Sequence, residues 1–120
     1  MSYDIKSFLL TSLFFLFVFS ASAQEKTPKV VTEEFEVQGV CIMCKLRIEN
    51  AALIKGVKLA EWDQETGVLK VIYKPKQTTL EEIQKAVAEH GHDTKTVKAS
   101  DKSYSNLPAC CAYRDGIEKH

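Results

Sequence analysis

Cys41 and Cys44 are the residues whose type and spacing most directly suggest chemistry, with Ile42 and Met43 between them. They stand where a strand-like stretch gives way to a helix-like stretch, so both thiols fall at the start of the predicted helix. A helix N-terminus stabilises negative charge, and we therefore expect both thiols to ionise more readily than a free cysteine. Two thiolates on one loop suit soft ions of low coordination number, Cu(I) first and Hg(II) next, whereas Zn(II) normally requires four ligands.

The same spacing also allows a disulfide, either structural or redox-active, between Cys41 and Cys44. A thioredoxin-like redox pair is expected in a longer α/β chain, after a central parallel strand, and this chain lacks that context. Metal binding is therefore the leading interpretation, and dithiol chemistry is the alternative.

Three further residues are candidate metal ligands: His92, Cys110 and Cys111. His92 follows a predicted turn and is either a third ligand or a solvated turn histidine. Cys110 and Cys111 pair with each other only under strain, because neighbouring cysteines hold their sulfurs badly for disulfide geometry. They could form a second soft-metal site, fold over the first site and make Zn(II) or a copper cluster feasible, or pin the tail through a disulfide.

The elements that must position these residues follow from hydrophobic periodicity and turn signals. Thr79 with Glu82 forms a capping box at the start of the second helix, and Gly91 ends that helix. The predicted order is a strand at Thr32–Gln38, a helix at Ile42–Lys55, a hairpin of Val57–Asp63 and Val68–Lys74, a second helix, and an edge strand at His92–Lys98. This order predicts an α+β fold, a ferredoxin-like βαββαβ open-faced sandwich with both helices on one face of an antiparallel sheet.

Residues 1–23 have the layout of a secretory signal peptide. A largely apolar run at Phe8–Phe19 is followed by small residues, with Ala21 and Ala23 at the cleavage-site positions. The run is short for a membrane span, although an uncleaved anchor is the alternative. We expect cleavage after Ala23, a periplasmic or secreted protein with no membrane insertion after cleavage, a leader at 24–31, one domain at 32–99 and a cysteine-containing tail at 100–120. Disulfides persist in such a compartment, so the redox state of the cysteines matters.

The sequence offers no support for two function classes, nucleic-acid-binding proteins and enzymes. Sixteen basic residues balance sixteen acidic ones, and they are interspersed along the chain. Without a basic stripe or a phosphate-binding glycine loop, nucleic-acid binding has no electrostatic support. No nucleophile stands with a matching base and no paired carboxylates stand out, so the sequence does not predict an enzyme.

In the stretch from about Thr32 to Lys98, the chain resembles the heavy-metal-associated domain family. The resemblance rests on Cys41 and Cys44 in the first loop, Ile48 in the helix core and Gly56-Val57 at the next strand, together with the Tyr73–Pro75 region. The family includes copper chaperones, modules of metal-pumping ATPases and the periplasmic mercury-binding protein. The resemblance implies that the partner is a metal-transporting membrane protein or another metal-binding domain. In some family members, a histidine at the position of His92 approaches the metal.

The chain departs from this family at the entry to the loop. Family members usually carry a glycine and a methionine before the first cysteine, with the methionine packed beneath the loop. Here Gly39-Val40-Cys41 is one residue shorter, and the methionine stands between the cysteines as Met43. The geometry of the loop is therefore not predicted by the resemblance.

Together these features predict an exported protein that binds a soft metal ion and acts as a metallochaperone or scavenger by thiolate ligand exchange. The alternative is a periplasmic dithiol–disulfide exchange protein that uses the same two cysteines. A third possibility is an interaction domain whose cysteines only stabilise the fold.

Overall fold

The structure is a computed structural model that describes residues 28–116. The predicted signal peptide, the start of the leader and the last four residues of the tail lie outside the described residues. Within residues 28–116, no helix is both long enough and apolar enough to cross a membrane.

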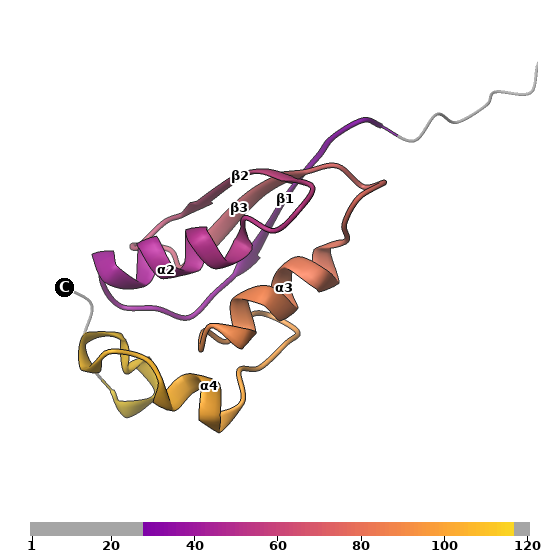
Figure 1. Cartoon of the computed structure of the whole chain (residues 1–120). Coiled ribbons are helices and arrows are strands. Elements are labelled where there is room, and N and C mark those ends of the chain that lie inside the picture. Colours follow the sequence, from indigo (N-terminus) through magenta and orange to yellow (C-terminus); the bar gives the residue numbers. More distant parts are fainter. Residues whose placement is uncertain (1–27, 117–120) are drawn as a thin grey trace, which may run out of the picture.

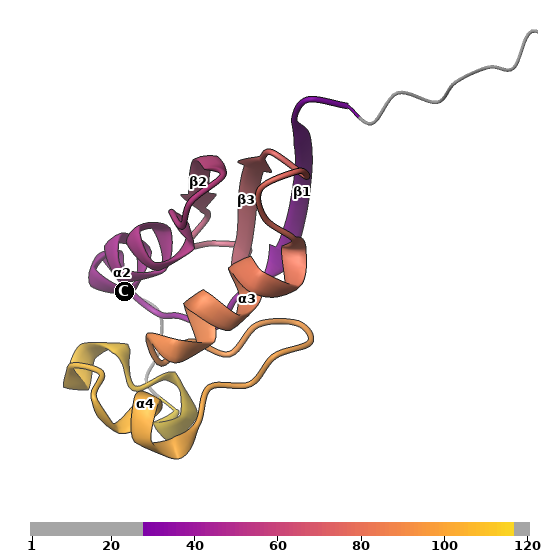
Figure 2. The same cartoon turned by 45° about the vertical axis from the view of Figure 1, so that its right-hand side comes forward.

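A three-stranded antiparallel sheet and two helices form the body of the protein. Its elements are β1 (Val31–Glu36), α2 (Ile42–Ala52), β2 (Val57–Trp62), β3 (Val68–Tyr73) and α3 (Leu80–Glu89). The strand order is β1-β3-β2, so the hairpin of β2 and β3 places β3 in the centre. Both helices cover the same face of this sheet (Figures 1 and 2). The open-faced sandwich predicted from the sequence is confirmed.

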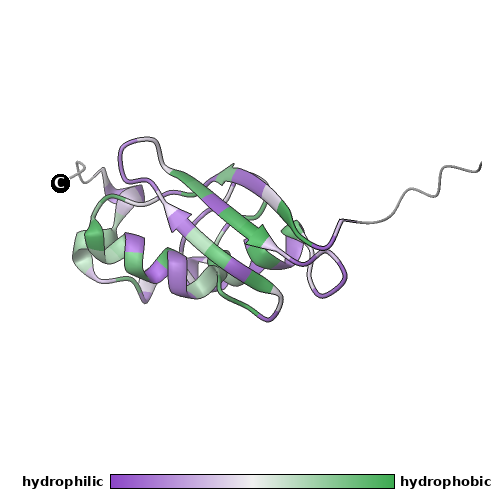
Figure 3. Cartoon of the chain, turned by 90° about the horizontal axis from the view of Figure 1, so that it is seen from above, coloured by the Kyte–Doolittle hydropathy of each residue, from purple (hydrophilic) through white to green (hydrophobic). Residues whose placement is uncertain are grey.

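The core lies between the sheet and the two helices, because each element presents one apolar face to it. On β3, Leu69, Val71 and Tyr73 alternate with more exposed residues, which is the period of a strand with one buried side. The strands accordingly alternate between hydrophilic and hydrophobic residues when seen from above (Figure 3). The helices contribute buried residues at helical spacing: Cys44, Ile48, Ala51 and Ala52 from α2, and Ile83 and Val87 from α3.

The predicted edge strand at His92–Lys98 is wrong. Within the described chain, this segment makes one isolated bridge, between Thr94 and Val37. Thr94 instead folds back on Val97, since its N–H donates to the Val97 carbonyl over 2.8 Å and its hydroxyl accepts from the Val97 N–H over 3.0 Å. The buried amide oxygen of Gln84 on α3 also accepts hydrogen bonds from Thr94 and Thr96. These contacts turn the segment toward α3 and away from β1.

The tail after residue 99 is folded, although its polar composition predicted a loop. It contains α4 (Asp101–Ser105) and two short 3-10 helices, η2 (Ala109–Cys111) and η3 (Tyr113–Asp115). This segment packs beside the end of α3 and the beginning of α2, on one side of the sandwich (Figure 2). The approach is close at Gly91, where a Cβ atom would lie 2.8 Å from the Ser103 carbonyl oxygen and 2.8 Å from Leu107.

Candidate metal centre

The loop that carries the cysteines is supported from below by the side chain of Trp62. Its indole N–H donates to the Val37 carbonyl over 3.1 Å, and its ring lies so close to Gly39 that an added Cβ would be 3.0 Å from it. Val40 is buried, whereas Met43 is 49% exposed. Val40 and Trp62 therefore fill the space beneath the loop, and Met43 does not take the place of the family's buried methionine.

Cys41 and Cys44 lie at the beginning of α2 as the sequence predicted. Cys41 is the N-cap residue with an extended backbone, and Cys44 falls in the first turn. Their sulfur atoms are 3.5 Å apart and belong to free thiols.

A third thiol joins this pair from the other end of the chain. The Sγ atom of Cys111 on η2 lies 3.7 Å from that of Cys41, and the three sulfurs of Cys41, Cys44 and Cys111 all lie within 4.8 Å of one another. All three side chains are buried, with exposures of 3%, 0% and 0%. Cys110 is only half-buried and is not part of this group, although its thiol contacts that of Cys41.

The three thiols differ in acidity because their surroundings differ. Burial opposes ionisation of Cys41, but interactions with the backbone and thiol of Cys44 and with the tail thiols outweigh it and lower the pKa of Cys41 to about 7. Burial raises the pKa of Cys44, so the prediction that both loop cysteines ionise readily holds for Cys41 alone. Burial also raises the pKa of Cys111, and its neighbouring thiols raise it further. The cluster is therefore best described as one acidic thiol beside two thiols that hold their protons more firmly.

His92 is fully buried, which rules out a solvated turn histidine. Its Nδ1 atom lies 2.8 Å from the Gln38 carbonyl oxygen and must carry the proton, since a carbonyl only accepts. Its Nε2 atom is buried and has no hydrogen-bond partner among the described residues. Burial lowers the pKa of His92 to about 4, so the ring is neutral at ordinary pH. His92 does not belong to the group of three sulfurs, and its role as a ligand stays a prediction.

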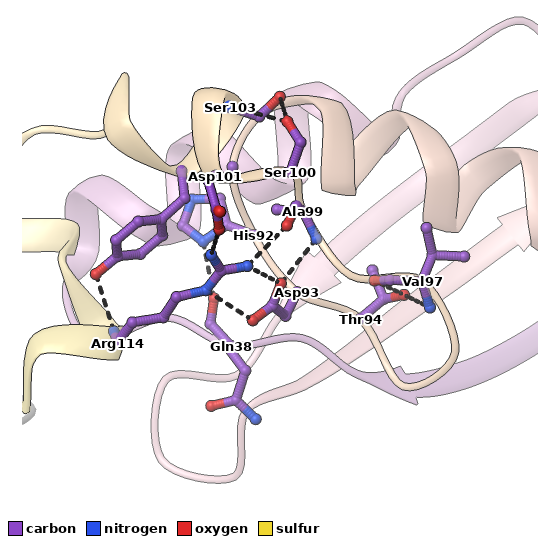
Figure 4. Close-up of polar contacts among 12 residues, drawn as sticks. Gln38, His92, Asp93, Thr94, Val97, Ala99, Ser100, Asp101, Ser103 and Arg114 are labelled. Carbon is purple, nitrogen blue, oxygen red and sulfur yellow. Dashed lines mark hydrogen bonds and ion pairs between the residues drawn. The ribbon is translucent and has the colours of Figure 1, made fainter.

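Tyr113, Arg114 and Asp93 attach the tail to the domain, and the sequence did not single out Arg114 or Asp93. The Tyr113 hydroxyl donates to the Gly91 carbonyl over 2.7 Å and accepts from the Asp93 N–H over 2.8 Å. Arg114 Nη2 lies 2.7 Å from Asp93 Oδ1 (Figure 4). The signal available in the sequence was an aromatic residue and an arginine that follow the cysteine pair of the tail after one alanine, but nothing there pointed to their partners.

Several solved structures resemble this protein in fold. No family model and no curated protein matches the chain. Among solved structures, the CopZ metallochaperone is 29% identical with a TM-score of 0.52 over 53% of this chain and 98% of that one. The N-terminal domain of a potential copper-translocating P-type ATPase from Bacillus subtilis is 28% identical with a TM-score of 0.53 over 60% of this chain and 92% of that one.

A putative copper-ion-binding protein from Bacillus anthracis is 21% identical with a TM-score of 0.53, over 57% of this chain and all of that one, and shares the fold. The fold is that of a heavy-metal-associated domain. The resemblance inferred from Cys41, Cys44 and the order of the elements is confirmed. The matches to CopZ and to the Bacillus anthracis protein cover 98% and 100% of those chains but only 53% and 57% of this one, so a large part of this protein lies outside the shared fold.

Proposed function

We propose that this protein binds a soft metal ion through thiolates, with Cu(I) as the preferred ion and Hg(II) as the second, and that it sequesters the ion or passes it on. The observation that carries the proposal is the convergence of Cys41 and Cys44 with a third buried thiol at the beginning of α2. The 29% identity to a metallochaperone over almost its whole length supports it. Thiolates select soft ions such as Cu(I), and neither carboxylates nor other hard ligands belong to the cluster.

The proposed mechanism is ligand exchange. A thiolate from an incoming partner binds the ion held by Cys41 and Cys44, and the resident sulfurs then release it one at a time. Cys41 is suited to begin capture because its lowered pKa leaves a large fraction as thiolate at neutral pH. Binding of the ion to the other thiols releases their protons, so the uptake of an ion should acidify an unbuffered solution.

The proposal extends to the location and the partner. A cleaved signal peptide at 1–23 would deliver the protein to the periplasm or the exterior, and the sequence of this segment is the support for export. A metal-transporting membrane protein is the proposed partner, because a domain of a potential copper-translocating P-type ATPase shares 28% identity with the chain.

Competitive titration of the reduced protein with Cu(I), Hg(II) and Zn(II) against a chelator checks the proposal. We expect tight binding of Cu(I) and Hg(II) that is lost when Cys41→Ser and Cys44→Ser are combined. A Cys110→Ser variant is the matched control, since Cys110 lies outside the group of three sulfurs. Binding by the double variant as tight as that of the parent protein would show that this is not the site.

A dithiol–disulfide exchange protein is the second candidate, because the sulfurs of Cys41 and Cys44 are only 3.5 Å apart and Cys41 has the low pKa of an attacking thiol. Turnover of a disulfide substrate by the metal-free protein would favour this function. Absence of turnover, together with tight Cu(I) binding, would favour the first.

A further inference from the structure

The Cys111 thiol lies beside Cys41 and Cys44, the two cysteines that an incoming thiolate would approach in the proposed exchange. Its sulfur lies 3.7 Å from that of Cys41 and is fully buried, at a separation of 70 residues along the chain. Three sulfurs bound about 2.3 Å from a central ion would lie about 4 Å apart in a trigonal arrangement. The observed separations of 3.5 and 3.7 Å, with all pairs within 4.8 Å, fit that arrangement with little movement.

We propose that Cys111 is the third ligand of the bound ion and that residues 100–116, here called the clasp, close the site over it. The proposal rests on soft-ion binding by Cys41 and Cys44. With Cys111 in place, the ion already has the three sulfurs of the exchange intermediate. An acceptor thiolate therefore has to displace Cys111, and with it the clasp, before the ion can leave.

The closed site also selects among ions. Zn(II) completes its coordination with a fourth ligand or a water molecule. Exposures of 3%, 0% and 0% for the three cysteines keep bulk water away from a bound ion while the clasp is closed. Cys110 contacts Cys41 but is not one of the three sulfurs that lie within 4.8 Å of one another, so it is not placed as a fourth ligand. The site therefore favours ions that are satisfied by two or three thiolates, Cu(I) and Hg(II), and disfavours Zn(II).

Most of the polar contacts between the clasp and the domain join Tyr113 and Arg114 to Gly91–Asp93. The Arg114 side chain, 26% exposed, bonds to both carboxylate oxygens of Asp93 and donates to the Ala99 carbonyl over 2.8 Å (Figure 4). The Tyr113 hydroxyl bridges Gly91 and Asp93, and its ring stacks on His92 at 5.8 Å between centroids. Arg114 and Tyr113 act on the ion only through the position of Cys111, so we regard them as positioning residues.

Counting the sulfur neighbours of the ion tests the third ligand. The reduced full chain loaded with one equivalent of Cu(I) is measured by X-ray absorption, alongside the matched variants Cys110→Ser and Cys111→Ser. We expect three sulfurs in the parent and in Cys110→Ser, and two in Cys111→Ser. The proposal is overturned if Cys111→Ser keeps the parent's count, if the parent has only two sulfurs, or if all four cysteines bind the ion.

A rate measurement tests the clasp without touching a ligand. The Arg114→Ala variant keeps all three sulfurs but loses a charge-assisted contact, so we expect release of Cu(I) to a chelator to be about tenfold faster. Lys85→Ala, which removes an exposed ion pair on α3, is the control and should leave the rate unchanged. An unchanged rate in Arg114→Ala would refute closure by the clasp.

These outcomes are separable from those of the proposed function. Suppose that the combined Cys41→Ser and Cys44→Ser variant loses the ion while Cys111→Ser and Arg114→Ala behave like the parent. In that case the proposal of soft-ion binding by Cys41 and Cys44 stands, and only the proposal of the clasp is refuted. A Zn(II) affinity in the parent that rivals its affinity for Cu(I) would contradict the selectivity of the closed site.

Discussion

The buried neutral state of His92 predicts that acid destabilises the metal-free protein. Its pKa falls from an ordinary value of 6.5 to about 4, chiefly because burial disfavours the charged ring. A histidine with a lower pKa in the folded state is protonated first in the unfolded chain. The free energy of unfolding therefore falls as the pH drops through 6.5 toward 4.

The size of the effect follows from linkage between protonation and folding. Between about pH 7 and about pH 5, the difference in proton binding by this one residue lowers the free energy of unfolding by about 2 kcal/mol. Solvent does not reduce this contribution to the free energy of unfolding, because the His92 side chain has 0% exposure.

Urea denaturation of the reduced, metal-free protein at these two pH values provides the measurement. The His92→Asn variant keeps an amide N–H near the position of Nδ1, which can donate to the Gln38 carbonyl, but it cannot be protonated. The variant loses ring packing at both pH values, so the comparison concerns the change with pH. Titration of Cys41 affects parent and variant alike and cancels.

We expect the parent to lose about 2 kcal/mol more than His92→Asn between the two pH values. An equal loss in the parent and in His92→Asn would refute the reasoning.

Three further substitutions have expected outcomes. Gly91→Ala places a methyl group 2.8 Å from the Ser103 carbonyl oxygen on a backbone with a φ of 99°, so amide hydrogen exchange should become faster throughout α4 and η2. Gly116→Ala is the control, because its φ is 77° but no atom lies within 4 Å of the new methyl group, and it should leave exchange in α4 and η2 unchanged. Thr79→Ala removes the hydroxyl that accepts from the Glu82 N–H and should cost about 1 kcal/mol in urea denaturation, and a cost near zero would contradict the assignment of the cap. Trp62→Phe leaves the buried Val37 carbonyl without its indole donor, so we expect a loss of about 1–3 kcal/mol by thermal unfolding, and an unchanged melting temperature would count against support of the loop by this bond.

The body of the fold was predictable because it depends on local patterns. The N-cap at Thr79, the alternation along β3 and the helical spacing of Cys44 and Ile48 each follow from a local pattern that the sequence displays directly. The pair of Cys41 and Cys44 was predictable for the same reason, since a spacing of three residues at a helix start is a local feature.

The rest depends on contacts between distant residues. The segment His92–Lys98 reads as a weak strand, but its conformation is decided by the buried amide of Gln84 on another element. The tail reads as a loop because its residues are polar, and its order depends on Asp93 and Gly91 as partners of Arg114 and Tyr113. A single sequence contains no signal that joins residues so far apart.

The separation of 70 residues between Cys41 and Cys111 has a thermodynamic consequence. An ion shared by these two thiolates would be a reversible cross-link that closes residues 41–111 into one loop, as a disulfide would, with β1 and η3 outside it. Cross-links that close long loops restrict the unfolded chain most. Loading the ion should therefore stabilise elements that never touch it, and by linkage a substitution that loosens the attachment of the tail should weaken binding of the ion. The free energy of unfolding and the affinity for the ion would therefore rise and fall together.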